Sequence, residues 1–299
     1  MRRSLLLGFF AFLGVITLSG CGGDDPCPAG TIKVNDSCVP LGKVFLTSSN
    51  GTAGFYKYDV ATDAWTTVAS PPVVTYSQIT TDGTLVYLLG SDNTIYSYSP
   101  ATDTWSTKFA CVGCNGGTPI GFFAWTEKGF YYANDGTTTL YHSDFVPNWT
   151  SQVLPTAWSC AGNYDAATGN IYARHYGNLG VAIFDTDTNT LAQSWPAATG
   201  VGENSRSGTY YGGYFYERAW SGSLQKVNMA TGVITDTGVT PAEGHTSTTV
   251  STSTGDIYIG PYSPTGTAFE VFHTANGTLS ALAPLPVAVS NHSTIVWVP

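Results

Sequence analysis

Five polar side chains stand at comparable points of the sequence and could form one binding or catalytic site. They are Tyr76, Glu203, Arg206, His245 and His292. A carboxylate, a guanidinium and two imidazoles around one opening could bind a sugar, a carboxylate or a metal ion, and imidazole can transfer protons near neutral pH. The alternative interpretation is that they are ordinary polar residues of the surface. The choice between these two interpretations depends on the secondary-structure elements that carry the five side chains.

Those elements belong to an internal repeat. Segment 59–65 (DVATDAW) recurs at 99–105 (SPATDTW) and, with less fidelity, further along the chain. The apolar anchor that ends each copy recurs at spacings of 40, 44, 42, 43 and 45 residues, at Trp65, Trp105, Trp149, Leu191, Ile234 and Leu279. A period of this length is typical of solenoids and propellers.

A second landmark marks a strand upstream of each anchor and keeps a similar period. Its members are aromatic: Phe45, Tyr87, Tyr131, Tyr172, Tyr216 and Tyr258. Between the landmarks, short β-rich runs alternate with turn residues. The sequence therefore predicts an all-β fold, a six-bladed β-propeller whose blades are four-stranded antiparallel sheets.

The pattern resembles the kelch repeat, including the galactose oxidase central domain, over Leu41 to Pro299. The blades end in a comparable Tyr-Asp, Thr and Trp series before a proline-containing loop such as Ser70-Pro71-Pro72, while of the kelch diglycine only Gly90 and Gly260 remain. The resemblance implies a propeller. Because the chain enters at what should be a second strand, residues 42–46, we expect the C-terminal strand, residues 293–298, to complete the first blade and remove its open edge.

In this register the candidate residues stand at the entries to the innermost strands, together with Phe122 and Asn163. His245 and His292 occupy equivalent positions in neighbouring blades. Galactose oxidase and N-acetylneuraminate epimerase also have kelch-like propellers, which suggests oxidase or epimerase chemistry at the channel mouth as one interpretation. We expect no cofactor and no metal ion. No G-x-S-x-G, H-E-x-x-H or P-loop motif occurs in the sequence.

One segment imitates the start of an EF-hand loop, at 185–189. The glycine required at its sixth place is Thr190 and the glutamate required at its twelfth is Pro196, so a calcium site of that kind is excluded. The segment is predicted to be another blade hairpin.

The N-terminus has the pattern of an exported lipoprotein. A basic start, Met1 to Arg3, precedes an apolar run too short to span a bilayer comfortably, and Leu18-Ser19-Gly20-Cys21 resembles the bacterial lipobox. The resemblance implies a signal peptide over 1–20 and lipidation of Cys21, followed by a tether at 21–41 and the propeller at 42–299. Because Gly22 follows the cysteine, we expect the cell envelope, and the outer membrane rather than the inner.

Five cysteines remain beside Cys21. Cys27 and Cys38 bracket a short segment and are expected to form a disulfide in an oxidising compartment. Cys111 and Cys114 form a CxxC motif that could be a disulfide within itself, or one of the two could pair with Cys160. A redox role needs a helix N-terminus, and no helix is predicted there.

The charge balance bears on the partners. Eleven basic and twenty acidic residues give a net charge of −9, and loss of Arg2 and Arg3 makes the mature chain more negative. This excludes nucleic acid as a favoured partner, and contact with the membrane is expected only through the lipid. We therefore expect a membrane-anchored extracytoplasmic binding module that recognises an envelope protein or glycan through its loops. The alternative is an enzyme acting on a small carbohydrate at the channel mouth.

Overall fold

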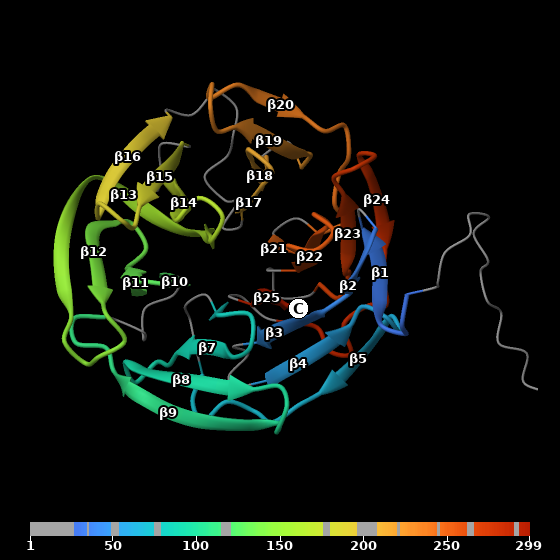
Figure 1. Cartoon of the computed structure of the whole chain (residues 1–299), viewed down its shortest axis with the longest axis horizontal. Helices are drawn as coiled ribbons and strands as arrows, with labels where there is room; N and C mark the ends of the chain where they lie inside the picture. Colours follow the sequence, from blue (N-terminus) through green and yellow to red (C-terminus); the bar gives the residue numbers. More distant parts are fainter. Residues whose placement is uncertain are drawn as a thin grey trace, which may run out of the picture.

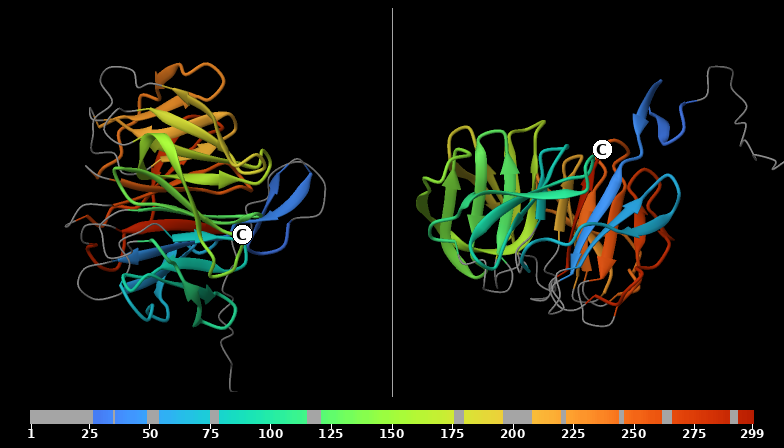
Figure 2. Two further views of the ribbon diagram at one scale, coloured as in Figure 1. Left: turned by 90° about the vertical axis from the view of Figure 1, so that its left-hand side faces the viewer. Right: turned by 90° about the horizontal axis from the view of Figure 1, so that it is seen from below.

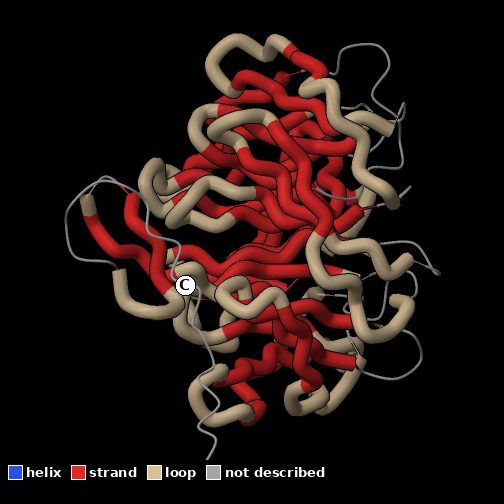
Figure 3. Tube along the Cα trace, turned by 90° about the vertical axis from the view of Figure 1, so that its right-hand side faces the viewer, coloured by secondary structure: helices blue, strands red, loops and turns tan. Residues whose placement is uncertain are grey.

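The computed structural model describes residues 27–34, 36–48, 54–74, 79–114, 121–175, 180–195, 208–219, 222–243, 246–261, 266–289 and 293–299, except for the side chains of 159–161 and 246. Within these ranges the regular elements are all β-strands (Figure 3). No helix in the described part of the chain is long and apolar enough to cross a membrane.

Beyond an N-terminal hairpin, the described strands form five sheets arranged around a common centre (Figure 1). One sheet has the order β25-β3-β4-β5, with bounds Thr294–Val298, Lys43–Ser48, Gly54–Asp59 and Ala64–Thr67. A second runs β6 to β9, at Ile79–Thr81, Val86–Leu89, Thr94–Ser99 and Thr104–Ala110. Two more run β17 to β20 (Gly208–Tyr211, Tyr214–Arg218, Leu224–Asn228, Ile234–Asp236) and β21 to β24 (Thr246–Val250, Ile257–Pro261, Glu270–His273, Thr278–Ala281).

The fifth sheet has seven strands and differs from the separate four-stranded blades that the sequence predicts. Its strands β10 to β16 are Phe122–Thr126, Gly129–Ala133, Thr137–Ser143, Thr150–Asp165, Asn170–His175, Val181–Asp185 and Thr190–Trp195. Strand β13 is 16 residues long and pairs with β12 through its first part and with β14 through its second. The chain stays extended through Pro155, whose fixed φ is compatible with a strand. One strand therefore serves as the outer edge of one four-stranded unit and the inner edge of the next.

The packing between sheets explains the aromatic landmark of the repeat. Phe45, Tyr87, Tyr131, Tyr172, Tyr216 and Tyr258 lie in β3, β7, β11, β14, β18 and β22, and all are buried. Successive side chains on each of these strands face opposite sides of the sheet. Val44 and Leu46 therefore join the core shared with the β21–β24 sheet, while Phe45 joins the core shared with the β6–β9 sheet. Each sheet is buried on both faces by its neighbours.

The Asp-x-Trp part of the repeat makes hydrogen bonds between sheets. The Asp103 carboxylate accepts from the Ala69 N–H at 2.8 Å, and the Trp105 indole N–H donates to the Ala69 carbonyl at 2.7 Å. Both polar groups of one residue in the neighbouring sheet are thereby satisfied. The Tyr98 hydroxyl also donates to Asp103, which has a φ of 53° that an aspartate tolerates better than most residues.

The same arrangement joins the two ends of the chain. The Asp63 carboxylate accepts from the Ala283 N–H at 2.8 Å, and the Trp65 indole donates to the Ala283 carbonyl at 2.9 Å. The C-terminal strand β25 also pairs antiparallel with β3, with Val296 opposite Phe45. Residues more than 200 positions apart in sequence are therefore neighbours in one sheet and at one sheet interface.

The N-terminal hairpin stands off one face of the disc (Figure 2). Its strands β1 (Thr31–Val34) and β2 (Ser37–Pro40) pair only with each other, and Cys27 is disulfide-bonded to Cys38. An isolated two-stranded hairpin has marginal stability, so the covalent link stabilises it. The Trp297 indole N–H donates to the Leu41 carbonyl at 3.2 Å, which fixes the junction between hairpin and disc beside the end of β25.

Candidate functional site

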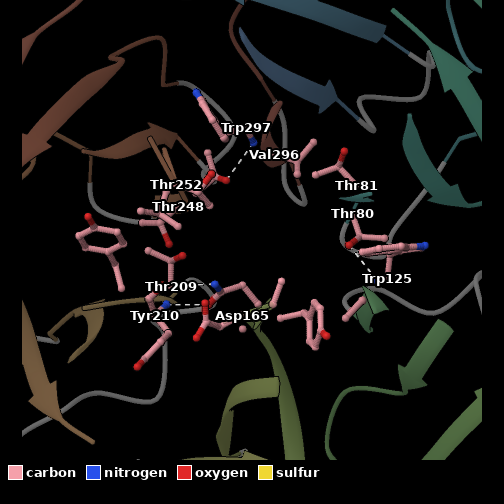
Figure 4. Close-up of a pocket in the computed structure, with 18 of the residues that line it drawn as sticks. Thr80, Thr81, Trp125, Asp165, Thr209, Tyr210, Thr248, Thr252, Val296 and Trp297 are labelled. Carbon is pink, nitrogen blue, oxygen red and sulfur yellow. Dashed lines mark hydrogen bonds between the residues drawn. The ribbon is translucent and has the colours of Figure 1, made fainter. Parts of the chain in front are cut away.

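A candidate site is a central cavity of about 780 Å³ (Figure 4). The described residues around it come from the innermost strands of the sheets: β6, β10, β13, β17, β21 and β25. Each of these strands contacts the next in this order, and β25 contacts β6. Turns that follow the inner strands, such as Asp82–Gly83 and Gly212–Gly213, line one end, where Pro299 also lies. This end is called the hairpin face, because the N-terminal hairpin leaves the disc beside the end of β25.

The five residues that the sequence selects, Tyr76, Glu203, Arg206, His245 and His292, lie outside the described residues, and so does Cys21. Each of the five precedes the start of an inner strand by a few positions, at β6, β17, β21 or β25. The starts of these strands are at the opposite end of the cavity from the hairpin face. This opposite end is called the entry face.

Phe122 and Asn163, which the sequence also places at the entries to inner strands, are among the described residues. Neither side chain is a free group at the mouth of the channel. Phe122 is completely buried against Trp158 in the core of the seven-stranded sheet. The Asn163 side chain bonds to the Tyr210 main chain, with its carbonyl accepting from the N–H at 2.6 Å and its amide donating to the carbonyl at 3.3 Å. Both residues therefore hold sheets together.

The cavity wall is built by hydrogen bonds from side chains on one inner strand to the main chain of the next. Thr80 accepts from the Trp125 N–H at 2.9 Å, and Thr249 accepts from the Trp297 N–H at 3.0 Å. Together with the Asn163 bond, these side chains take the place of main-chain pairing between neighbouring inner strands. The inner strands consequently stay far enough apart to leave a cavity. Sequence analysis named Asn163 but missed Thr80 and Thr249, although each of the three pairs with the aromatic landmark of its sheet, as Thr80 pairs with Tyr87.

Aromatic side chains give the wall its apolar part. Trp125 and Tyr164 come from adjacent inner strands and meet edge to face, with ring centroids 6.3 Å apart. Across the cavity from Trp125 are Thr248, Thr209 and Tyr210 (Figure 4). Tyr210 is stacked on Tyr172 of the neighbouring sheet, and burial raises the pKa of the Tyr210 hydroxyl above its ordinary value. The Tyr210 hydroxyl therefore remains a proton donor at physiological pH.

The charged side chains among the described lining residues are Asp82 and Asp165. Asp82 accepts from the Thr84 and Leu85 main-chain N–H groups at 2.7 Å and from the Tyr87 hydroxyl at 2.8 Å. Asp165 accepts from the Thr168 hydroxyl at 2.8 Å. Both carboxylates thus organise the turns at the hairpin face and add negative charge there.

A buried ion pair links the seven-stranded sheet to the β17–β20 sheet. Arg174 Nε lies 3.3 Å from Glu217 Oε2, and both side chains are almost completely buried. Burial raises the pKa of the Glu217 carboxyl, and the Arg174 charge opposes that shift. Nearby, His175 contacts the Ser194 hydroxyl at 2.7 Å, and burial lowers the pKa of its imidazole.

The remaining cysteines and the EF-hand-like segment have structural places. Cys111 and Cys114 are bonded to each other and buried in an apolar cluster, while the side chain of Cys160 lies outside the described residues. Asp185 accepts from the main-chain N–H groups of 187 and 188, and these bonds lower the pKa of its carboxyl in the turn between β15 and β16. No group of three close metal-ligating side chains occurs in the described ranges.

No model of a known protein family matches the chain, and no curated protein matches it in sequence. Solved structures do. A chain in the crystal structure of a nidogen/laminin complex aligns with a TM-score of 0.63 at 12% identity, covering 85% of this chain and 98% of that one. TolB from Acinetobacter baumannii aligns with a TM-score of 0.60 at 14% identity, covering 85% of this chain and 66% of that one. These similarities show a β-propeller fold.

Proposed function

We propose that the chain is a membrane-anchored extracytoplasmic binding module, which recognises an envelope protein or glycan through the loops of its entry face. The observation that carries the proposal is the opposite placement of two features. The N-terminal hairpin leaves from the hairpin face, whereas Tyr76, Glu203, Arg206, His245 and His292 precede the strands that start at the entry face. A tether on one face directs the other face away from the membrane.

We propose six kelch-like blades for the module, with the third and fourth sharing β13. The six inner strands, each of which contacts its two neighbours around the cavity, support this count, and the pairing of β25 with β3 supports closure of the first blade by the C-terminus. A closed propeller is a rigid platform, so its loops lose little conformational freedom on binding. Fold alone does not determine function, and a protein partner fits the use of the propeller fold in a complex such as nidogen/laminin.

The anchor is part of the proposal. Lipidation of Cys21 would place the acyl chains a few residues before the disulfide-bonded hairpin, and the hairpin would hold the disc off the outer membrane surface. Two or more acyl chains on one residue give stable anchoring. Cys21→Ser should release the chain from the membrane fraction and abolish incorporation of labelled palmitate. A variant that stays in the membrane fraction and still incorporates labelled palmitate would contradict the anchor.

Photo-crosslinking from the two faces of the full-length chain tests the binding function. A photoreactive phenylalanine analogue replaces Tyr76 at the entry face or, as the control, the exposed Ala167 at the hairpin face. We expect discrete adducts with envelope components from position 76 and none from position 167. Equal labelling from both positions, or none from either, contradicts recognition by the entry face. Turnover of a free sugar that His245→Ala abolishes would support the alternative, an enzyme.

A further inference from the structure

The wall of the central cavity carries a second inference, which concerns the ligand of the channel itself and goes beyond the proposed binding function. Hydroxyl groups dominate its polar surface, because inner-strand positions that reach the cavity are occupied by threonine or serine from several sheets. They include Thr80, Thr81, Thr209, Ser247, Thr248, Thr249 and Thr294, and Thr252 lines the cavity from the turn that follows β21. Unlike a carboxylate or an ammonium group, a hydroxyl both donates and accepts hydrogen bonds.

Several of these hydroxyls keep a donor for a ligand. Thr80 and Thr249 use an oxygen lone pair to accept from the main chain of the next inner strand, which leaves the hydroxyl protons to be donated elsewhere. Thr248 is partly exposed in the wall, while its hydroxyl oxygen is turned away from the cavity and has no hydrogen-bond partner among the described residues. Rotation about the Cα–Cβ bond of Thr248 would turn the hydroxyl into the cavity, and a ligand that satisfies it there gains affinity, because a buried polar group without a partner is costly.

The wall also has the apolar surface that a sugar ring needs. Trp125 and Tyr164 are partly exposed on one side of the cavity, and Tyr210 and Tyr211 line it from β17. A sugar presents C–H groups on the faces of its ring and hydroxyls at the edge. An aromatic surface next to hydroxyl groups matches both parts of such a ligand, and the cavity volume is in the range of about 300–1,000 Å³ typical of ligand sites.

Charge decides against the other polar ligands. The described lining contains two carboxylates, Asp82 and Asp165, and no basic side chain, so an anionic ligand is repelled. A cation would need acceptors that converge on it. The Asp82 oxygens already accept from three donors of their own turn, and Trp125 and Tyr164 meet edge to face, which is not the face-on cage that binds an ammonium group.

We propose that the central channel is a binding site for a neutral oligosaccharide, with Trp125 as the stacking surface and the Thr248 hydroxyl as a hydrogen-bonding group. The residues of this site are different from Tyr76, Glu203, Arg206, His245 and His292, which precede the inner strands in sequence and lie outside the described residues.

Calorimetric titration of the full-length chain, in a detergent without a sugar headgroup, tests the proposal. The probes are three neutral trisaccharides (maltotriose, cellotriose and N,N′,N″-triacetylchitotriose), the anionic trigalacturonate and the cationic glucosamine trimer. We expect at least one neutral probe to bind and trigalacturonate to bind about tenfold more weakly or not at all. Absence of binding by all neutral probes at millimolar concentration overturns the proposal, as does preference for either charged probe.

Four variants in the cavity wall and one control outside it locate the site. Thr248→Val removes a hydroxyl that has no described partner and should weaken the binding of the neutral probe about threefold to tenfold. Trp125→Ala should weaken it further, with Trp125→Phe restoring part of the loss. Asp165→Asn removes one of the two described carboxylates of the lining and should strengthen trigalacturonate binding severalfold. Thr107→Val, the same change on the exposed outer strand β9, is the control and should have no effect.

Unfolding midpoints of every variant establish that the disc is intact. Unchanged affinity in both Thr248→Val and Trp125→Ala, with the fold retained, overturns the channel assignment. The crosslinking readout at position 76 separates this result from the proposed function. Crosslinks that persist when no sugar binds support recognition by the entry face and contradict only the channel ligand. Sugar binding without crosslinks supports the channel ligand and contradicts recognition by the entry face.

Discussion

Removal of the C-terminal strand, by deleting residues 293–299, should unfold the whole disc and not only a tail. Ile295, Val296, Trp297 and Val298 retain 5%, 9%, 4% and 5% exposure. Burial of an apolar side chain contributes about 1.5–3 kcal/mol, so the four together contribute roughly 6–12 kcal/mol. The total stability of a domain is typically about 5–15 kcal/mol. The loss is therefore comparable to the entire free energy of unfolding.

The strand acts at two interfaces at once, which explains why the loss should be global. Ile295 and Trp297 pack in the core shared with the β21–β24 sheet, whereas Val296 and Val298 pack in the core shared with the β6–β9 sheet. Its removal also exposes the edge of β3, which invites aggregation.

Urea unfolding, followed by tryptophan fluorescence and far-UV circular dichroism, measures the effect. The shortened chain should show no cooperative transition, and a synthetic peptide of residues 293–299 added in excess should restore part of it. Ile295→Ala should cost about 2–5 kcal/mol, and Val153→Ala, at a side chain 79% exposed, should stay within about 0.5 kcal/mol. A shortened chain with the midpoint and the denaturant slope of the full-length chain would refute the reasoning, because the slope reports the surface exposed on unfolding.

Three further predictions concern contacts between sheets. Trp105→Phe removes the hydrogen bond to the Ala69 carbonyl and should lower the free energy of unfolding by about 0.5–1.5 kcal/mol; a variant as stable as the parent would show that water replaces the bond. Glu217→Gln leaves the buried Arg174 charge without its carboxylate and should cost about 3–5 kcal/mol, whereas the double variant with methionine at both positions should recover most of that loss in chemical denaturation. Because burial lowers the pKa of folded His175, the unfolded state binds more protons below its ordinary pKa of about 6.5, so stability should fall as the pH falls through that value. His175→Gln should flatten this dependence in unfolding midpoints measured between pH 5 and 8, and identical profiles would contradict it.

The sequence predicts the features that recur with one residue type. Trp65 and Trp105 recur because each donates an indole N–H to the neighbouring sheet, and tyrosine or phenylalanine recurs in each second strand because that position is buried between two sheets. Physical contacts that every sheet must make leave a period in the sequence. The all-β propeller fold could be predicted for that reason.

Contacts that the sheets make with different residue types leave no period in the sequence. Thr80 and Thr249 accept a main-chain hydrogen bond at the cavity wall through a hydroxyl and Asn163 through an amide carbonyl, so no single residue type marks the position. The ion pair of Arg174 and Glu217 occurs at one interface of the described part of the chain. The continuation of β13 through two units was missed as well, because the Trp149 anchor keeps the normal period while the chain beyond it does not turn.

That shared strand makes the units of the disc unequal. Where two neighbouring sheets are connected by a loop, an engineer could open new termini or insert a domain between them, and each sheet would keep its own ladder of hydrogen bonds. The third and fourth units have no such loop within β13 (Thr150–Asp165), and a cut there would remove a strand from both. Circular permutants opened within 150–165 should therefore fail where those opened between β9 and β10 succeed, and amide exchange should show these two units opening together as one.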